Sequence, residues 1–180
     1  MQIVNSLLSE ILLIKPNIIK SDNIFEITFS SDELKKLGID YKFIQENESF
    51  SNKNVLRGLH YQIIHPQGKL IQVIEGEIFD FVVDMRKSSP TFGLSTSFIL
   101  SSENNLLAWI PPGFAHGFYV LGNKALINYK VTDYRYPEYE RTLLWSDPIL
   151  GIVWPFENQM PILSEKDADG KLLKFCELYP

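Results

Sequence analysis

The sequence predicts a mainly β protein whose antiparallel strands close into a sandwich or barrel. From Val55 onward, short runs rich in valine, isoleucine, phenylalanine and tyrosine alternate with turn sequences such as HPQG, SSPTFG and PPG. Strands of this length and spacing are typical of antiparallel all-β architectures. The 180 residues, 45% hydrophobic and 22% charged, fit one soluble globular domain over residues 1–180.

The N-terminal third is expected to be extended, with one short helix. Ser30 precedes Glu33 by three residues, which is a capping-box spacing, and Gly38 stands where a helix of about two turns would end. A second short helix is expected in SEKDADGKLLKF, where Ser164 again has an acid three residues later. The terminal LYP is expected to be a loose tail. No repeat, low-complexity tract or linker divides the chain.

Composition narrows the classes of partner and compartment. The net charge of −5 and pI near 5.2 give no electrostatic footprint for nucleic acid, so an anionic ligand requires a local cluster of cations. One cysteine, Cys176, excludes an intrachain disulfide framework and fits a reducing compartment. The apolar N-terminus is interrupted by Glu10, lacks a basic leader, and is too short to span a bilayer. We therefore expect a cytoplasmic protein with no membrane partner.

The three histidines, His60, His65 and His116, are the first candidates for chemistry, although a lone histidine is usually structural. A zinc or iron site would need three or more ligands, commonly with an H-x-H pair on one strand. His65 follows His60 by five residues across a predicted turn, so the two do not share a strand face and His65 is expected to be exposed. Glu75 is then the only further candidate ligand, and metal binding is the weaker interpretation.

Proton transfer requires fewer residues than a metal site does. A histidine with an orienting carboxylate and a partner acid is sufficient. In ALINYKVTDY, alternation places Tyr129 on the face expected to line the barrel interior, where it is either this acid or a core aromatic. Lys69 at the head of QGKLIQV is either a solvated strand end or a stabiliser of a developing oxyanion. Arg57, three residues before His60, suits phosphate or sugar hydroxyls.

The order and spacing of several motifs add a resemblance. VLRGLHYQ, QGKLIQVIEGEIFDFVVDMRKSSPTFG, WIPPGFAHGFYVL, YKVTDY, DPILGIVWP and PILSEKDAD span roughly Gln45 to Gly170. The chain resembles the dTDP-4-dehydrorhamnose 3,5-epimerase family of nucleotide-sugar epimerases. The resemblance implies a cupin-type β jelly roll (double-stranded β-helix), whose core we place at about 54–155, before the expected C-terminal helical segment at about 163–176. It also implies a homodimer that exchanges N-terminal strands (about 1–50) and catalysis without a metal or other cofactor.

The family's functional residues match positions of this chain. The resemblance implies that His60 is the base, that Asp167 pairs with it, and that Tyr129 is the acid. It implies that Lys69 and His116 hold the 4-keto sugar and its enolate. The positions that match substrate and phosphate contacts are Arg57, Glu140, Lys166, Gln45 and Asn47.

The first departure from the family pattern lies near the N-terminus. The family segment D-x-R-G-F-F-x-E contributes an arginine to the nucleotide diphosphate, but here the sequence is KSDNIFEITF. Phe25 and Glu26 match the end of the motif, whereas its arginine and glycine are missing and Lys20 is the nearby cation. Glu26 is therefore retained as a candidate substrate contact.

The second departure is Arg135 in DYRY, where the family has an aromatic residue that packs on thymine. An arginine can stack on a base or present a two-donor fork to a purine edge. This favours the hypothesis of a GDP-linked 4-keto-6-deoxy sugar, heptoses included. The alternative is that Tyr134 or Tyr136 packs on thymine instead.

We therefore expect an epimerase of a nucleotide-linked 4-keto-6-deoxy sugar that inverts C3, C5 or both beside the C4 ketone. A GDP-linked heptose epimerase and a sugar nucleotide 3,4-ketoisomerase are alternatives that use the same fold and related enol chemistry. Two more distant alternatives are a metal-dependent cupin, such as a dioxygenase, and a non-catalytic sugar-binding cupin. The expected partners are a nucleotide diphosphate sugar and a second copy of the chain.

Overall fold

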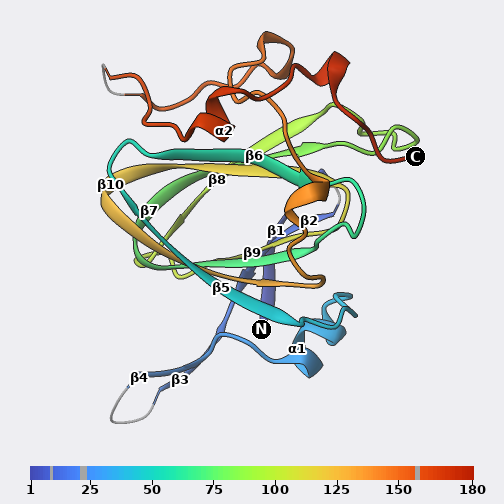
Figure 1. Ribbon diagram of the computed structural model, residues 1–180. Helices are drawn as coiled ribbons and strands as arrows, with labels where there is room; N and C mark the ends of the chain where they lie inside the picture. Colours follow the sequence, from blue (N-terminus) through green and yellow to red (C-terminus); the bar gives the residue numbers. More distant parts are fainter. Residues whose placement is uncertain (9, 21–23, 157–158) are drawn as a thin grey trace.

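A computed structural model describes residues 1–8, 10–20, 24–156 and 159–180 (Figure 1). The strands are β1 (Gln2–Leu7), β2 (Ile11–Lys15), β3 (Asn17–Lys20), β4 (Ile24–Ile27), β5 (Gln45–Asn52), β6 (Leu56–Gln62), β7 (Lys69–Asp84), β8 (Ser95–Ser101), β9 (Leu107–Ile110), β10 (Phe114–Val131) and β11 (Glu140–Thr142). The helices are α1 (Ser31–Lys36) and α2 (Glu165–Ala168), with 3₁₀ turns η1 (Pro137–Tyr139), η2 (Pro148–Leu150) and η3 (Leu173–Phe175).

The strands form the predicted β jelly roll. In the described chain, a nine-stranded antiparallel sheet has the order β1-β2-β9-β7-β10-β6-β11, with β5 also paired to β10 and β8 to β7. The two longest strands, β7 and β10, pair from Phe114↔Asp84 to Val131↔Lys69. They curve so strongly that the sheet wraps around a central space (Figure 1). Paired and curved in this way, the strands enclose an interior with alternating inward-facing residues.

The interior holds an apolar core. Ile78, Val82, Leu100 and Val120 are fully buried within it. The predicted alternation on β10 is confirmed, because residues 125, 127 and 131 are buried while Tyr129 packs against the same core. The polar side chains described below occupy the space that this core leaves.

The N-terminal region lies on the outside of the barrel. The β1–β2 hairpin joins the sheet through β2 and β9, and the β3–β4 hairpin projects away from the barrel (Figure 1). The predicted first helix is confirmed. Ser30 caps α1 by accepting a hydrogen bond from Glu33 N, and Gly38 adopts a φ of +88° just after its end.

One prediction for the C-terminal region holds in part and another was wrong. The expected short helix begins after Ser164 as α2, but it is only one turn, because the chain then pairs with the barrel through a bridge between Leu143 and Lys171 before the 3₁₀ turn η3. A Cβ on Gly170 would lie 2.8 Å from Leu144 Cα, so this close approach favours glycine. The terminal LYP is not loose, since Tyr179 is 8% exposed and its hydroxyl donates to the Gln62 carbonyl.

Candidate active site

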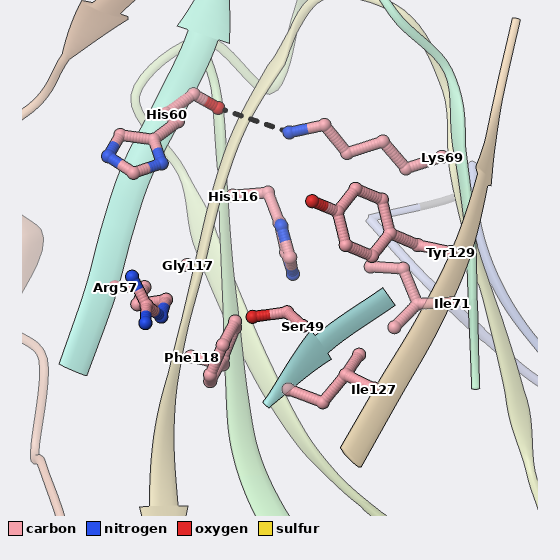
Figure 2. Close-up of a pocket in the computed structure, with 10 residues that line it drawn as sticks. All are labelled: Ser49, Arg57, His60, Lys69, Ile71, His116, Gly117, Phe118, Ile127 and Tyr129. Carbon is pink, nitrogen blue, oxygen red and sulfur yellow. Dashed lines mark hydrogen bonds between the residues drawn. The ribbon is translucent and has the colours of Figure 1, made fainter. Parts of the chain in front are cut away.

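A cavity with polar walls opens beside the apolar core, which contributes Ile71, Phe118 and Ile127 to its lining. Its inner part, about 100 Å³, is shown in Figure 2 and is lined by Ser49, Arg57, His60, Lys69, Ile71, His116, Gly117, Phe118, Ile127 and Tyr129. An outer part of about 330 Å³ shares five of these residues and adds Asn47, Gln67, Arg135, Glu140, Ser164, Lys166 and Asp167. The cavity therefore runs from an apolar floor to a charged mouth.

Two glycines bring the strands that carry His60 and His116 together. His60 on β6 is in register with His116 on β10. A Cβ on Gly58 would lie 2.6 Å from Gly117 Cα, and Gly58 has a φ of +109°, a conformation that side chains rarely tolerate. Glycine at position 58 therefore permits the two strands to approach this closely.

His60 is held by a buried carboxylate. Its Nε2 lies 2.6 Å from Asp167 Oδ1, the imidazole is 28% exposed and the carboxylate is 2% exposed. Asp167 also accepts hydrogen bonds from the Gly58 N–H at 3.2 Å and the Ser164 hydroxyl at 2.7 Å. Burial opposes ionisation of Asp167, but these donors outweigh it and lower its pKa. Burial also lowers the pKa of His60, partly offset by Asp167, so the imidazole is a neutral base at physiological pH.

A second histidine–carboxylate pair, which the sequence analysis missed, lies deeper. His116 Nε2 is 2.9 Å from Asp80 Oδ2 on β7, and the Asp80 side chain is fully buried. Among the described residues, Asp80 Oδ1 has no hydrogen-bond partner. Burial raises the pKa of Asp80, although His116 and Lys69 act in the opposite direction.

Lys69 begins β7 and extends into the cavity toward the backbone of His60 (Figure 2). Its Nζ lies 3.5 Å from the His60 carbonyl oxygen, at the limit of a hydrogen bond. Burial lowers the pKa of Lys69 to about 8, while the carboxylates of Asp80 and Glu140 favour its charged form. The lysine is thus not a solvated strand end, and it places a positive charge inside the cavity.

Tyr129 faces the cavity from the side opposite His60 (Figure 2). It lies on β10, in register with Asn47 of β5, which also lines the outer part. Burial raises the pKa of Tyr129, and Arg135 and Arg57 only partly counter this. The phenol therefore stays protonated at neutral pH.

The mouth carries a network around one carboxylate. Glu140 accepts two hydrogen bonds from Arg135, through Nε and NH2 at 2.9 Å each, and a third from Lys166 Nζ at 2.8 Å. Burial opposes ionisation of Glu140, yet these two cations lower its pKa to about 2. Lys166 lies on α2 beside Asp167, so the mouth adjoins the helix that holds the carboxylate partner of His60.

The outer part of the cavity is basic although the whole chain is acidic. It is lined by four cationic side chains, Arg57, Lys69, Arg135 and Lys166, against two carboxylates. Arg57 donates its Nε to the Ser51 hydroxyl at 3.0 Å and forms no ion pair with any described residue. This is the local cation cluster that an anionic ligand of an acidic protein requires.

Two of the twelve predicted site residues lie apart from the cavity. Gln45 donates to Asn47 Oδ1 at 2.7 Å but lines neither part. Glu26 lies on the projecting β3–β4 hairpin, where it accepts a hydrogen bond from Asn105. The side chains of Lys20 and Phe25 fall outside the described residues. The other ten line the cavity.

Sequence reasoning missed several lining residues and one role. Ser49 and Gln67 carried no signal because each is a common polar residue in a strand or turn. Asp80 did carry a sequence signal, because an acid that alternates with Ile78 and Val82 on a buried strand needs a polar partner in the protein interior. Ser164 was predicted as a helix cap only, but it also donates to the carboxylate next to His60.

Within the described ranges, no three histidine, cysteine, aspartate or glutamate side chains converge as a metal site would require. Glu75, the further candidate ligand, pairs instead with Lys124 at 2.8 Å. His65 is exposed, as predicted, and pairs with Asp133. The described helices include none that is long and apolar enough to cross a membrane.

Comparison with known proteins gives a consistent match. A family model described as dTDP-4-dehydrorhamnose 3,5-epimerase matches residues 5–174. Curated proteins of that name are 48% identical in Neisseria gonorrhoeae and 44% identical in Methanothermobacter thermautotrophicus, over 95% and 93% of this chain. The chain covers 92% of the Methanothermobacter protein but only about half (52%) of the Neisseria protein.

A solved structure extends the match to three dimensions. It is the dTDP-6-deoxy-D-glucose-3,5-epimerase of Legionella pneumophila in complex with dTDP-4-keto-L-rhamnose. The two chains are 46% identical with a TM-score of 0.94, over 99% of this chain and 97% of the Legionella chain. The likeness thus covers the barrel, the cavity and the N-terminal hairpins together.

Proposed function

The chain belongs to the dTDP-4-dehydrorhamnose 3,5-epimerase family, and on that premise we propose that it inverts C3, C5 or both of a dTDP-linked 4-keto-6-deoxy sugar. The observation that carries this proposal is the arrangement of one base, one acid and a buried cation around one cavity. His60 and Tyr129 face that cavity from opposite sides, and Lys69 reaches toward His60 from the same side as Tyr129 (Figure 2). Inversion needs this arrangement, because a proton must leave one face of the ring and return to the other.

The first step is removal of a carbon-bound proton next to the C4 ketone. Because Nε2 of His60 is bonded to Asp167, the tautomer with the proton on Nε2 leaves Nδ1 free to act as the base. Nδ1 takes the proton, the C–H electron pair forms a carbon–carbon double bond, and the carbonyl electrons move to the C4 oxygen. Asp167 stabilises the imidazolium that results.

The enolate that forms must be stabilised where its charge develops. Lys69 presents a buried ammonium, and His116, bonded to Asp80, presents its ring beside it. In a site with little water, a positive charge next to the C4 oxygen stabilises the enolate more than the neutral ketone. These two residues are assigned to that oxygen.

The second step returns a proton to the opposite face. The Tyr129 hydroxyl donates it to the carbon, and the electrons on the C4 oxygen re-form the ketone. Solvent then restores the proton of the phenol and takes the proton from His60. The outer cavity would hold the diphosphate, with Arg57 as its cation that has no ion pair among the described residues.

The proposal is tested by incubating a dTDP-linked 4-keto-6-deoxy hexose with the protein in D₂O and following the ring protons by NMR. Deuterium should appear at C3, C5 or both, and the position shows which carbons invert. The variant His60→Ala should lose the exchange by at least 10²-fold, whereas His65→Ala, which alters an exposed histidine, should keep it. No exchange by the wild type, or undiminished exchange by His60→Ala, contradicts the proposal. A product with the ketone moved to C3 would favour the 3,4-ketoisomerase.

We also propose that the chain acts as a homodimer that exchanges N-terminal strands. β1 is an edge strand with Ile3 and Val4 at 36% and 48% exposure, and the β3–β4 hairpin projects without another strand partner among the described residues. An exchanged hairpin would also give Glu26 a route to the neighbouring cavity. Light scattering after gel filtration should give twice the 20.8 kDa chain mass; an active monomer would contradict this.

A further inference from the structure

Gln62 is a buried amide that has no part in the proposed proton transfers. It is the last residue of β6, two positions after His60, and it is 3% exposed. Because strand residues two apart share a face, its side chain follows that of His60 along the same side of β6. A buried amide needs hydrogen-bond partners, so the partners of Gln62 show which parts of the chain it holds.

The amide of Gln62 holds the backbone on both sides of Arg135. Its Nε2 donates to the Tyr134 carbonyl at 3.1 Å, and its Oε1 accepts from the Tyr136 N–H at 2.7 Å. Nε2 also donates to the His65 carbonyl at 2.7 Å. Two carbonyls and one N–H fix the orientation of the amide, because only its nitrogen can donate. The loop that carries Arg135 is therefore tied to the turn that follows β6.

The backbone of Gln62 positions the partner of Arg135. In the pairing of β6 with β11, Gln62 is in register with Glu140. The next residue continues this contact, since the Ile63 N–H donates to the Tyr139 carbonyl at 3.1 Å. Gln62 thus contacts both sides of the Arg135–Glu140 ion pair, one side through its side chain and the other through its backbone.

The Arg135–Glu140 pair requires such support because it lies at the mouth of the cavity. The Arg135 side chain is 58% exposed, and an exposed ion pair by itself stabilises a loop only slightly. Fixing the backbone on both sides of Arg135 removes conformational freedom that the pair alone would have to overcome. The two hydrogen bonds of 2.9 Å to Glu140 can then form in the protein without a ligand.

We propose that Gln62 is a positioning residue for substrate binding, which fixes the loop around Arg135 and so places the Arg135–Glu140 pair before the nucleotide sugar enters. The inference rests on the proposed function, because it takes the outer part of the cavity as the site of the nucleotide diphosphate. A site that is already ordered binds more tightly, since no loop has to be ordered on binding. His60 is held separately by Asp167, so the chemical step depends less on Gln62.

Gln62→Met tests this role, because it keeps the length of the side chain and removes all three hydrogen bonds of the amide. We expect the Kd for dTDP, measured by calorimetry, and the KM for the nucleotide sugar to rise about tenfold. The kcat for deuterium exchange should stay within about threefold of the wild type. If Gln62→Met does not fold, Gln62→Glu takes its place at pH 8. Its carboxylate keeps the shape but cannot donate to the Tyr134 carbonyl, so the same rise in Kd is expected.

Tyr61→Phe is the matched control on the neighbouring residue of β6. The Tyr61 hydroxyl donates to the Glu177 carbonyl at 2.7 Å, and Tyr61 lines neither part of the cavity. Its removal also deletes a hydrogen bond of a buried side chain, so it should lower stability. It should nevertheless keep the wild-type Kd for dTDP.

A double-mutant cycle tests whether Gln62 acts through Arg135. Arg135→Ala removes the side chain that the loop presents, so Gln62→Met should raise the Kd for dTDP little further in this background. Losses that simply add would show that Gln62 does not act through Arg135, and they would overturn the proposal.

Three further outcomes overturn the positioning role. They are a Gln62 variant that binds dTDP as tightly as the wild type, a Tyr61→Phe variant that loses as much affinity as Gln62→Met, and a loss confined to kcat. Normal exchange with an unchanged KM in Gln62→Met would refute the positioning role alone. The expected dTDP series without any exchange would refute the reaction alone, and a wild type that does not bind dTDP would refute both.

Discussion

Two histidine–aspartate pairs face the same cavity, and their carboxylates are held in opposite ways. Asp167 accepts hydrogen bonds from an imidazole, a backbone N–H and a hydroxyl, and its pKa is lowered. Asp80 is fully buried with one oxygen on His116 and the other without a partner among the described residues, and burial raises its pKa. The same two residue types therefore lie in two different environments, and the environment sets the pKa of each carboxylate.

Both carboxylates are buried, but Asp167, with three hydrogen-bond partners, suits a role beside a base, whereas Asp80, with one unpartnered oxygen among the described residues, suits the placement of charge. Because its pKa is lowered, Asp167 stays ionised, and in the proposed reaction it would orient His60 and stabilise the imidazolium after proton abstraction. Asp80 lies near Lys69 and favours its charged form against the effect of burial. We infer that the first pair moves the proton, while the second keeps positive charge beside the C4 oxygen.

The largest expected effect follows from removing the charge of the first pair. Asp167→Asn should lower kcat by roughly 10²- to 10⁴-fold, because an amide can hold His60 in the wrong tautomer and does not stabilise the imidazolium. The measurement is deuterium exchange at saturating substrate. Asp169→Asn, an exposed acid just after α2, is the matched control and should keep wild-type kcat. If Asp167→Asn keeps more than a tenth of wild-type kcat, the first pair is not the proton-transfer unit.

The pH dependence of kcat/KM in the wild type should depend on His60 of the first pair and on Lys69, whose charged form is favoured by Asp80 of the second pair. The rate should rise as His60 loses its proton, at a pH below the ordinary value of 6.5 because burial lowers the pKa of His60. It should fall as Lys69 loses its proton near pH 8, since burial lowers the pKa of Lys69 to about 8. Tyr129 should titrate above this range because burial raises its pKa. A rate that still rises above pH 9 would contradict a required Lys69 ammonium.

Asp80→Asn distinguishes the two pairs, because it should shift the basic limb of the pH profile and leave the acidic limb, which belongs to His60, unchanged. The Asp80 carboxylate favours the charged form of Lys69, so its removal should lower the pKa of Lys69 and shift the basic limb to lower pH. We expect kcat at neutral pH to fall about tenfold, less than for Asp167→Asn. The Asp167→Asn variant serves as the comparison and should keep its basic limb. An unshifted basic limb in Asp80→Asn would mean that Asp80 does not tune Lys69.

The sequence could predict the features of the site that depend on local patterns, but not those that depend on partners far apart in the chain. Alternation on β10 placed Tyr129 correctly, because one buried face fixes the register of a strand. The roles of His60 and Asp167 came from motif resemblance, since 107 residues separate them and no local pattern joins them. Asp80 was missed for the related reason that its partner lies 36 residues away on another strand.

The C-terminal errors have a different physical cause. The pattern that predicted a helix to about residue 176 was local, but Lys171 donates its N–H to the Thr142 carbonyl at 2.9 Å and Tyr179 donates its own to Met85. Backbone hydrogen bonds to the barrel thus replaced those of a longer helix. Tertiary pairing decided both cases.

The smallest expected effect concerns Ser164, which has two roles at once. Its Oγ accepts from Asp167 N at 3.2 Å as the cap of α2, and its hydroxyl contacts Asp167 Oδ2 at 2.7 Å. Ser164→Ala should lower the free energy of unfolding by about 1 kcal/mol, as loss of a cap does, and lower kcat a few-fold. Ser30→Ala removes the cap of α1, where Ser30 Oγ accepts from Glu33 N at 3.4 Å, and should cost similar stability with no change in kcat. Chemical denaturation measures the loss of stability in both variants, and deuterium exchange measures their kcat. If the kcat of Ser164→Ala equals that of Ser30→Ala, the Ser164 hydroxyl does nothing for Asp167 beyond capping the helix that carries it.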